Sequence, residues 1–557
     1  MSDVVVVQLG QSIVVRRRSK HANQPHGWFS LSLSLSLRRV LFLCAGPLRG
    51  LFPTCFHCLM QALLNNNVYE AEPCVCHQTL LLNLEIDRLV AAEEQTPPGA
   101  LLTRHATASS DGKLLAQAGL SVKTAMSARK YALSLAAQHP DKPVTAIAQA
   151  AWAGDPQLMQ GDSLNALSPH VAEFFGPVLS ILTLANSHVV DTTEGLVMID
   201  CGTQFAAPRI GKTCRNRLPG KPLHTVIYTH GHVDHVGVQF CGFPEPFRVV
   251  AHENCPRRFD RYKRTNGYNT IINSRQFQLP MDVYKFPSDF RYPDLTYQDY
   301  LRFDVGGETF ELFHGKGETD DATIVWMPKR RYLFCGDFFI WNAPNAGNPQ
   351  KVQRYPEEWA AAALKILDLK PIVVFPGHGP PILGEDRVQE AFSNQYSLLK
   401  GICDHAMAGM NAGKSLGELM RTVPIQKKLI SLPYLVPKYD DPRWFVATLW
   451  RRYAGWYTFD IRHLFPVAAK DVGDELAHLV GGAEKLAAHA ESLLNRGGDD
   501  QLGVALEIAE YAAATAGAST EAHRIRAKIL RALEKRETTL MASSIYRAAA
   551  IDSEAKL

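Results

Sequence analysis

The chain has no apolar run long enough to cross a membrane. The nearest candidate, residues 40–64, is interrupted by Pro47 and Pro53, whereas a membrane-spanning helix needs about 20 consecutive apolar residues. A large excess of charge is also missing, because 59 basic and 55 acidic residues leave a net charge of only +4 over 557 residues. No basic stripe interleaved with aromatic residues occurs either. We therefore expect neither a transmembrane segment nor nucleic-acid binding.

Acidic residues are missing from the start of the chain. None lies between Asp3 and Glu70, whereas arginines accumulate there and serine alternates with leucine over residues 31–37. An arginine-rich, serine-rich and acid-poor start is typical of an organellar transit peptide, and the alternative is a poorly ordered extension without function. We expect residues 1–97 to form such an extension. The protein is predicted to be soluble and intracellular, with mitochondrial import as a more specific alternative.

Cysteines are few beyond this extension. Five of the 11 cysteines lie within it, some of them in the groups Cys55-Phe-His-Cys58 and Cys74-Val-Cys76-His77. Zinc binding by these groups is one interpretation, although their spacing fits no finger pattern well. The other six cysteines are scattered along the chain, which is typical of buried thiols in a reducing compartment.

The densest group of metal-binding side chains follows an apolar run of β type, Thr-Val-Ile-Tyr-Thr at residues 225–229. The next six residues contain three histidines and one aspartate: His230, His232, Asp234 and His235. A strand that ends in a tight loop can direct such side chains at two adjacent points. Imidazole and carboxylate suit zinc best, with iron or manganese as alternatives. The pattern predicts a metal site, and a dinuclear one.

Three later segments repeat the order of apolar run, glycine and metal-binding side chain. One places Glu318 directly after Gly317, with His314 as a competing ligand, and the other two end in Asp337 and His378. Glycine allows a sharp turn and a close approach of the backbone to a ligand. Each segment alone is more typical of an ordinary turn. Together and in this order, they predict one shared site.

The order of these segments resembles the metallo-β-lactamase-fold hydrolases over residues 175–400. Residues 186–202 resemble the opening hairpin of that family, in which Asp200 braces the metal loop. The resemblance implies an α/β protein with a four-layer αββα fold. It also implies the ligands: His230, His232 and the residue at 318 for one metal, Asp234, His235 and His378 for the second, and Asp337 as a bridge.

Position 318 narrows the resemblance. Most of the superfamily has a histidine there, and Glu318 is similar to the zinc-dependent alkyl sulfatases. Residues 450–466 resemble the junction into the alkyl sulfatase dimerisation domain. Gly455-Trp-Tyr457 matches the family pattern, whereas residues 458–461 depart from its Asp-Gly-Asn-Pro-like turn.

This resemblance implies a dinuclear zinc hydrolase that cleaves alkyl sulfate esters by a metal-bridging hydroxide. Asp337 would position the hydroxide and Asp234 would help to orient it, so these two are the predicted catalytic residues. With Glu318 as a third carboxylate, the metals alone attract an anionic ester less, and nearby groups should hold it. Candidates follow Asp337, in a loop that could also be an ordinary turn: Asn342, Asn345, Asn348, Lys351 and Arg354.

Helical patterns flank the predicted catalytic domain. Residues 98–174 are rich in alanine and include a predicted helix over residues 122–138, so they form a helical lead-in. Residues 401–557 are predicted to be an all-α domain of helical hairpins, similar to tetratricopeptide-like pairs and to an alkyl sulfatase dimerisation domain. Its apolar periodicity marks three amphipathic helices, over residues 486–494, 502–513 and 525–533.

Alternatives remain at this level. The C-terminal helices are predicted to form a homodimer, but they could simply be a cap that buries the sheet domain. Within the enzyme class, lactones, thioesters and phosphodiesters are alternative substrates. A different class of function is a partner-binding helical module with a vestigial metal domain, although the full set of ligands argues against decay. Between residues 251 and 300 no motif is readable. Five residues there are candidates for contact with an anion, and residues 273–277 are the first to examine: Arg257, Arg258, Arg261, Tyr262 and Arg275.

Overall fold

The computed structural model describes residues 4–9, 12–17, 119–160, 167, 170–277, 279 and 284–557. The described residues belong to two units, one within Met1–His105 and the other within Ala106–Leu557. In the first, strands β1 (Val4–Leu9) and β2 (Ser12–Arg17) form an antiparallel hairpin. The five N-terminal cysteines and most of the predicted transit segment lie outside the described residues. All that follows concerns the second unit.

The helical lead-in consists of α6 (Gly119–Gln138) and α7 (Pro143–Trp152). The prediction of a helix ending at Gln138 is confirmed, and its start lies three residues earlier than expected. Pro143 occupies the first turn of α7, where the missing N–H has no cost. The lead-in is tied to the sheet domain, because the backbone N–H of Thr145 donates to Glu173 Oε2 at 2.8 Å.

The first sheet has seven strands in the order β3-β4-β5-β6-β7-β8-β9. Pairing is antiparallel from β3 to β6 and parallel from β6 to β9. β4 and β6 are buried at every position, which agrees with sequences that are apolar except for Ser180. The strands are β3 (Val171–Phe175), β4 (Val178–Leu182), β5 (Ser187–Thr192), β6 (Gly195–Ile199), β7 (Leu223–Ile227), β8 (Arg248–His252) and β9 (Leu295–Tyr297). Helices α9 (Ala207–Arg217), η1 (Val238–Phe240), α10 (Asn254–Arg264) and α11 (Asn266–Phe277) connect them.

The second sheet has six strands in the order β10-β11-β12-β13-β14-β15. Only β13 and β14 pair in parallel, and α12 crosses between them. α12 begins at Pro356 with two glutamates in its first turn, where the missing N–H of proline has no cost and acidic side chains lie near the positive end of the helix. The strands are β10 (Tyr300–Val305), β11 (Glu308–Gly315), β12 (Ala322–Met327), β13 (Tyr332–Gly336), β14 (Val373–Pro376) and β15 (Ile382–Leu383), with α12 (Pro356–Leu369) and α13 (Glu385–Asn411).

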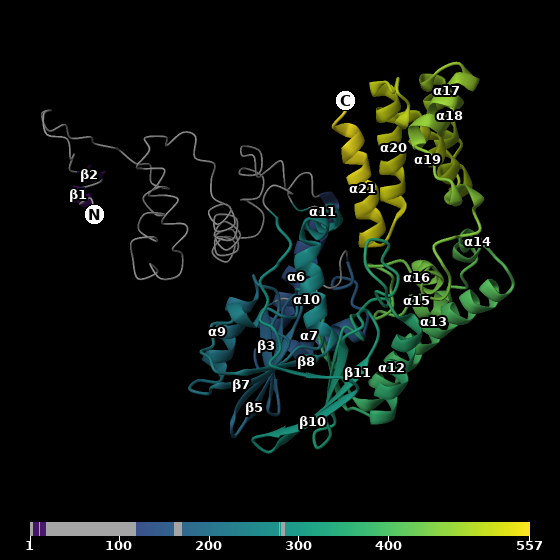
Figure 1. Cartoon of the computed structure of the whole chain (residues 1–557). Coiled ribbons are helices and arrows are strands. Elements are labelled where there is room, and N and C mark those ends of the chain that lie inside the picture. Colours follow the sequence, from purple (N-terminus) through teal and green to yellow (C-terminus); the bar gives the residue numbers. More distant parts are fainter. Residues whose placement is uncertain are drawn as a thin grey trace, which may run out of the picture. The chain divides into compact units, whose positions relative to one another are not determined.

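The two sheets pack face to face through a shared apolar core, in which Val190 and Ile227 of one sheet meet Phe334 and Phe375 of the other. Helices α9 and α10 cover the outer face of the first sheet, and α12 and α13 cover that of the second (Figure 1). The predicted four-layer αββα fold is confirmed. Two of the three predicted domain boundaries, after residues 174 and 400, fall within β3 and α13. The division into domains stays a prediction.

Beyond α13, the structure describes helices and connecting loops only. The three predicted amphipathic helices correspond to α18, α19 and α20, whose small side chains, such as Ala490 and Ala509, are fully buried. The helices are α14 (Leu416–Arg421), α15 (Lys427–Ile430), α16 (Trp444–Tyr453), η2 (Ile461–Leu464), α17 (Ala469–Val480), α18 (Ala483–Arg496), α19 (Asp499–Ala514), α20 (Thr520–Arg536) and α21 (Leu540–Glu554).

The C-terminal helix α21 contacts both the beginning of the helical region and the sheet domain. The backbone N–H groups of Leu540 and Met541 donate to the carbonyls of Lys438 and Tyr439 in the loop before α16, at 2.8 and 3.1 Å. On α11, Arg275 forms an ion pair with Asp552 of α21. Among the described helices, none is both long enough and apolar enough to cross a bilayer.

Candidate metal centre

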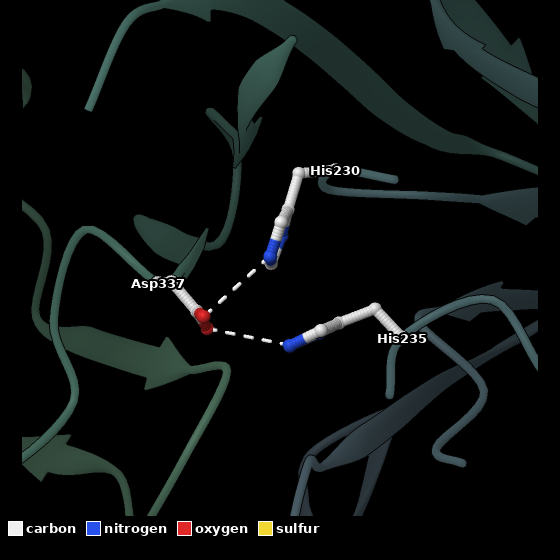
Figure 2. Close-up of side chains that lie close together, drawn as sticks. All are labelled: His230, His235 and Asp337. Carbon is white, nitrogen blue, oxygen red and sulfur yellow. Dashed lines mark ion pairs between the residues drawn. The ribbon is translucent and has the colours of Figure 1, made fainter. Parts of the chain in front are cut away.

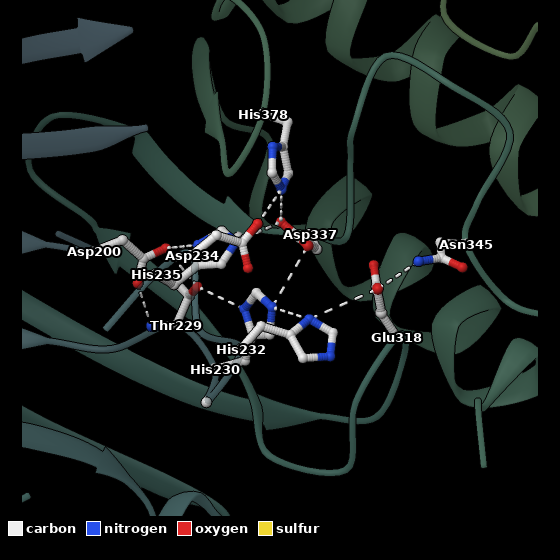
Figure 3. A network of polar contacts seen from close by, with 12 residues as sticks. Asp200, Thr229, His230, His232, Asp234, His235, Glu318, Asp337, Asn345 and His378 are labelled. Carbon is white, nitrogen blue, oxygen red and sulfur yellow. Dashed lines mark hydrogen bonds and ion pairs between the residues drawn. The ribbon is translucent and has the colours of Figure 1, made fainter. Parts of the chain in front are cut away.

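The predicted ligands lie where strands of both sheets end at a common edge. The loop after β7 carries the histidine-rich motif, and single ligands follow β11, β13 and β14. All seven predicted side chains converge there (Figure 3). They are His230, His232, Asp234, His235, Glu318, Asp337 and His378.

One half of the cluster is built around His232. Its Nδ1 lies 2.9 Å from His230 Nε2 and 3.7 Å from Glu318 Oε1. Asp337 Oδ2 lies 3.5 Å from His230 Nε2. Zinc–ligand bonds are about 2.0–2.3 Å long, so donor atoms at these separations could share one cation. This half corresponds to the first predicted metal position.

The other half is built around Asp234, whose Oδ2 lies 3.8 Å from His235 Nε2 and 3.5 Å from His378 Nε2. Asp337 also reaches this half, because its Oδ1 lies 3.4 Å from His235 Nε2 and 3.5 Å from His378 Nε2. The two oxygens of Asp337 thus face different halves of the cluster, and Figure 2 shows them directed at His230 and His235. This is the arrangement that a bridging carboxylate requires.

The cluster fits divalent cations. His235 Nε2 and Asp337 Oδ1 are buried and have no hydrogen-bond partner among the described residues, a state that costs about 1–3 kcal/mol per atom. Burial alone would lower the pKa of His235, but the surrounding carboxylates, Asp337 first, raise it to about 10. The pKa of His378 rises to about 9 because Asp337 outweighs burial in the same way. The cluster therefore favours positive charge, which bound cations would supply.

Asp200 braces the metal loop from one side, where the resemblance placed it. Its carboxylate accepts hydrogen bonds from the backbone N–H and the hydroxyl of Thr229, both at 2.7 Å. It also lies 2.8 Å from Nδ1 of His235, which leaves Nε2 to face the cluster. His378 is fixed similarly, through Nδ1 and the carbonyl of Leu184.

Asp321 braces the same loop from the other side. It accepts a hydrogen bond from the N–H of Gly231 at 2.8 Å and from Arg258 Nε at 3.1 Å. Burial opposes the charge on Asp321, but Arg258 outweighs it and the pKa of Asp321 is lowered. Arg258, one of the residues that the sequence analysis gives as candidates for contact with an anion, instead supports the metal loop through Asp321. No sequence signal links residues 63 positions apart.

Glu318 is held by the loop that follows β13. Asn345 Nδ2 donates to Glu318 Oε1 at 2.5 Å, and Arg354 Nη1 lies 3.1 Å from the same oxygen. Arg354 also donates to the backbone carbonyl of Glu318, and the N–H of Tyr355 donates to Gly317 at 2.9 Å. Burial raises the pKa of Glu318 to about 8, with Arg354 opposing it. Two residues predicted to hold the substrate anion therefore contact a predicted metal ligand.

The other candidates for the anion are placed differently. Asn342 Oδ1 accepts a hydrogen bond from the N–H of Lys438 at 3.2 Å, which ties the loop to the C-terminal region. The half-buried Lys351 donates from Nζ to Asn273 Oδ1 at 2.8 Å. Within the described ranges, no carboxylate lies in ion-pair distance of Lys351 Nζ. Asn273 belongs to the stretch that the sequence marks for contact with an anion.

His314 lies apart from the cluster. Its ring stacks on that of His252, with centroids 3.7 Å apart, and its Nε2 lies 3.0 Å from the carbonyl of Asp320. It belongs to none of the groups of converging donors in the described part of the chain. The geometry favours Glu318 over His314 as the ligand. The six cysteines beyond the extension are free and buried, as the sequence predicts.

Two family models match the chain. The metallo-beta-lactamase superfamily matches residues 181–238 and 249–378, and the alkyl sulfatase dimerisation family matches residues 416–556. The first match ends at residue 378 and the second begins at residue 416, in the order that the fold presents, a sheet domain followed by helices.

Three curated proteins show the same relationship at low identity. A linear primary-alkylsulfatase of Pseudomonas sp. is 25% identical over 66% of this chain and 74% of its own length. An alkyl/aryl-sulfatase of Saccharomyces cerevisiae is 23% identical over 64% of this chain and 59% of its own length. An (R)-specific secondary-alkylsulfatase of Pseudomonas sp. is 23% identical over 56% of this chain and 52% of its own length. The chain thus spans about half to three quarters of the length of these relatives.

Among solved structures, the stereoselective inverting sec-alkylsulfatase Pisa1 from Pseudomonas sp. aligns with a TM-score of 0.63. The alignment covers 71% of this chain and 67% of that protein, at 19% sequence identity. At this identity the likeness concerns the fold.

Proposed function

Because the chain is a metal-dependent hydrolase of the metallo-β-lactamase superfamily, in its alkyl sulfatase-like branch, we propose that it cleaves alkyl sulfate esters with two zinc ions. The observation that carries the proposal is the ligand set, in which Glu318 completes one half of the cluster beside His230 and His232. The match of the C-terminal helices to the alkyl sulfatase dimerisation family supports the same branch.

The two halves of the cluster would each hold one divalent cation. His230, His232 and Glu318 would serve the first, and Asp337 would join it to the second. When bound, such ions lower the pKa of water enough to supply a nucleophile at neutral pH, and they stabilise charge on a leaving oxygen. Zinc suits imidazole and carboxylate donors best, and iron or manganese could take its place.

The residues around the cluster would fix the ligands before substrate arrives. Asp200 orients His235, and Asp321 holds Gly231 at the centre of the loop. Such supporting contacts typically change metal affinity or activity by about 10–100-fold when removed.

Lys351 is the group that we propose to bind the sulfate. A sulfate monoester carries one negative charge, and Lys351 offers an ammonium group that is half-buried and hydrogen-bonded to a neutral amide, Asn273. A charge-assisted hydrogen bond contributes about 1.5–3 kcal/mol. Three other residues remain candidates for contact with the anion: Asn342, Asn345 and Arg354. Asn345 and Arg354 donate hydrogen bonds to Glu318, and Asn342 accepts one from Lys438.

Arg354 would restore the positive charge that a glutamate removes. A histidine at position 318 would be a neutral ligand, whereas Glu318 adds one negative charge to the centre. Arg354 lies 3.1 Å from that carboxylate and is buried with it, so the pair is nearly neutral. The centre then keeps its attraction for an anionic ester.

We also propose that two copies of the chain pair through residues 416–556, since that region matches a dimerisation family. Hydrolysis and pairing are separate proposals, because no residue of the metal cluster lies in that region.

The direct test of the hydrolysis is release of inorganic sulfate from a short primary alkyl sulfate by the zinc-loaded protein. We expect turnover by the wild type and its loss in Asp337→Ala. His314→Ala is the matched control, because this histidine is the competing ligand in the sequence but lies outside the donor groups, and it should retain turnover. Hydrolysis of a lactone, thioester or phosphodiester panel without sulfate release would overturn the proposed substrate.

A further inference from the structure

One side of α10 and α11 presents basic and apolar side chains at the surface. Residues 254–277 contain six basic residues and a single acidic residue, Asp260. Helical hydrogen bonds cross the junction between the two helices. The N–H of Thr265 donates to the carbonyl of Arg261, and the N–H of Asn269 donates to that of Thr265, both at 2.9 Å. α11 therefore continues the course of α10 (Figure 1).

Five residues spaced three or four positions apart along this course lie on one side of it, because this spacing matches the turn of a helix. None of the five is buried. Tyr268 is 61% exposed and Ile271 is 50% exposed, which is high for large apolar side chains. We call these residues the arginine face: Arg257, Arg261, Arg264, Tyr268 and Ile271.

The arginines of this face are not neutralised by carboxylates. Arg257 donates from Nη1 to a neutral amide, Asn254 Oδ1, at 3.1 Å. In the part of the chain that the structure describes, no carboxylate lies within ion-pair distance of the three arginines. Asp260 on the neighbouring side of α10 accepts a hydrogen bond from the hydroxyl of Tyr292 at 2.7 Å. The positive charge of the face is therefore available to an external anion.

The helix dipole explains only part of this arrangement. Cations are favourable in the last turn of a helix, where Arg261 and Arg264 lie. Arg257 lies in the first turn of α10, where a cation is unfavourable. The dipole also does not account for Tyr268 and Ile271 at the surface of α11. The combination indicates a partner that is both anionic and apolar.

We propose that the arginine face docks on the surface of an anionic lipid bilayer. Basic side chains bind the headgroups of anionic lipids, and tyrosine is enriched where headgroups meet acyl chains. Arginine can extend its guanidinium to the headgroups while its methylene groups lie along apolar surface. Ile271 would enter the acyl layer. A nucleic acid could pair with the arginines but offers no comparable apolar layer, so the bilayer is favoured.

α11 joins this face to the candidate metal centre. On the buried side of the helix, Asn273 accepts a hydrogen bond from Lys351, the residue that we propose to bind the sulfate. Docking would therefore place a helix that contacts the proposed sulfate site against a surface in which amphiphilic esters dissolve. The docking itself does not depend on the proposed hydrolysis, and its test needs no substrate.

Co-sedimentation of the full chain with lipid vesicles is that test. We expect binding to mixed vesicles of phosphatidylcholine and phosphatidylserine, and none to vesicles of phosphatidylcholine alone. Binding should weaken as the salt concentration rises from about 0.1 M to about 1 M, because exposed charges are screened. A chain that binds neither kind of vesicle, or that binds both equally, would overturn the proposal.

Two double variants test the face itself. Arg261→Gln/Arg264→Gln should weaken binding to the mixed vesicles roughly 30-fold, since each basic residue near an anionic membrane contributes about fivefold. Tyr268→Ser/Ile271→Ser should weaken it by about tenfold or more, because less apolar surface enters the bilayer. Wild-type binding by both variants would contradict the proposal.

Matched controls carry the same kinds of change elsewhere on the surface. Arg302→Gln/Lys414→Gln removes two exposed basic residues from other elements. Leu479→Ser/Val504→Ser removes two apolar side chains that are 78% and 48% exposed. Both controls should bind as the wild type does, and losses equal to those of the face variants would overturn the assignment. Binding of a DNA or RNA oligonucleotide without vesicle binding would assign the face to nucleic acid and would also overturn it.

Discussion

Glu318 is the residue on which the chemistry of the site turns. Its carboxylate, which we propose as a metal ligand where a histidine would be neutral, has two partners on one oxygen, the buried guanidinium of Arg354 and the amide of Asn345. Arg354 also binds the backbone carbonyl of Glu318, so one side chain sets both the charge and the position of the ligand. The effect of replacing Arg354 on zinc binding should therefore depend on whether residue 318 is a glutamate.

A double-mutant cycle tests that dependence. In the native background, Arg354→Met should weaken zinc binding and lower kcat/KM by roughly 10–100-fold, because it leaves Glu318 without its support. In a Glu318→His background the same change should have little effect, since a neutral imidazole needs no cation beside it. Zinc affinity is measured by chelator competition, and kcat/KM by sulfate release. Equal losses in both backgrounds would contradict the pairing.

The titration of Lys351 predicts that KM for an alkyl sulfate depends on pH. Burial first, and then Arg354, lowers the pKa of Lys351 to about 8. The ammonium is present below that pH and is lost above it, so KM for an alkyl sulfate should rise above pH 8, by about tenfold or more if a charge-assisted hydrogen bond is lost. The pH profile of KM is the measurement.

Two variants separate Lys351 from other groups. Lys351→Gln should raise KM at neutral pH and flatten its pH dependence. Lys351→Arg keeps the charge at all accessible pH values, so its KM should stay low above pH 8. An unchanged pH profile of KM in both variants would assign the dependence to another group.

Elements of secondary structure bring the ligands together by ending at one edge. β11 ends beside α12, and the glycines there allow close packing. A Cβ at Gly317 would lie 2.7 Å from Phe338 and 3.3 Å from Trp359, both of which are buried. The next residue is Glu318, so packing between strand and helix fixes where the ligand points.

Gly317→Ala is therefore expected to lower the free energy of unfolding by about 1–3 kcal/mol, as overpacking typically does, and to weaken zinc binding. Gly267→Ala in α11 is the control, since no atom lies within 4 Å of its Cβ position. Denaturant unfolding and chelator competition report the two effects. A Gly317→Ala protein as stable as the wild type would show that the strand end can move freely.

The sequence predicts these elements where local signals are strong. Proline and two glutamates mark the start of α12, and His139-Pro140 ends α6. Apolar runs that end in glycine and a ligand predict the strand ends of the metal cluster. These features depend on neighbours along the chain, which is why periodicity and turn chemistry find them.

Contacts between distant segments are not predictable in the same way. Asp321 and Arg258 support the metal loop, but neither position carries a motif, because their role arises from tertiary packing. For the same reason Asn345 and Arg354 were predicted to meet the substrate, and their contacts with Glu318 emerge only in the folded chain.

At the scale of the molecule, a metal-binding sheet domain is joined to a helical domain that contacts it at several points. Asp552 of α21 forms an ion pair with Arg275 of α11, and Arg451 of α16 donates to the carbonyl of Lys351. Through these contacts the helical region packs directly against the residues that support the metal cluster. The partner-binding alternative, with a vestigial metal domain, is disfavoured by the convergence of all seven predicted ligands.

Titration of metal-free protein with zinc is the most direct test of the proposal that this chain is a dinuclear zinc hydrolase. Bound zinc and release of sulfate from a short alkyl sulfate are followed in the same samples. We expect bound zinc and the rate of sulfate release to reach a plateau together, at about two zinc ions per chain. Absence of zinc binding, or sulfate release that does not depend on bound zinc, would contradict it.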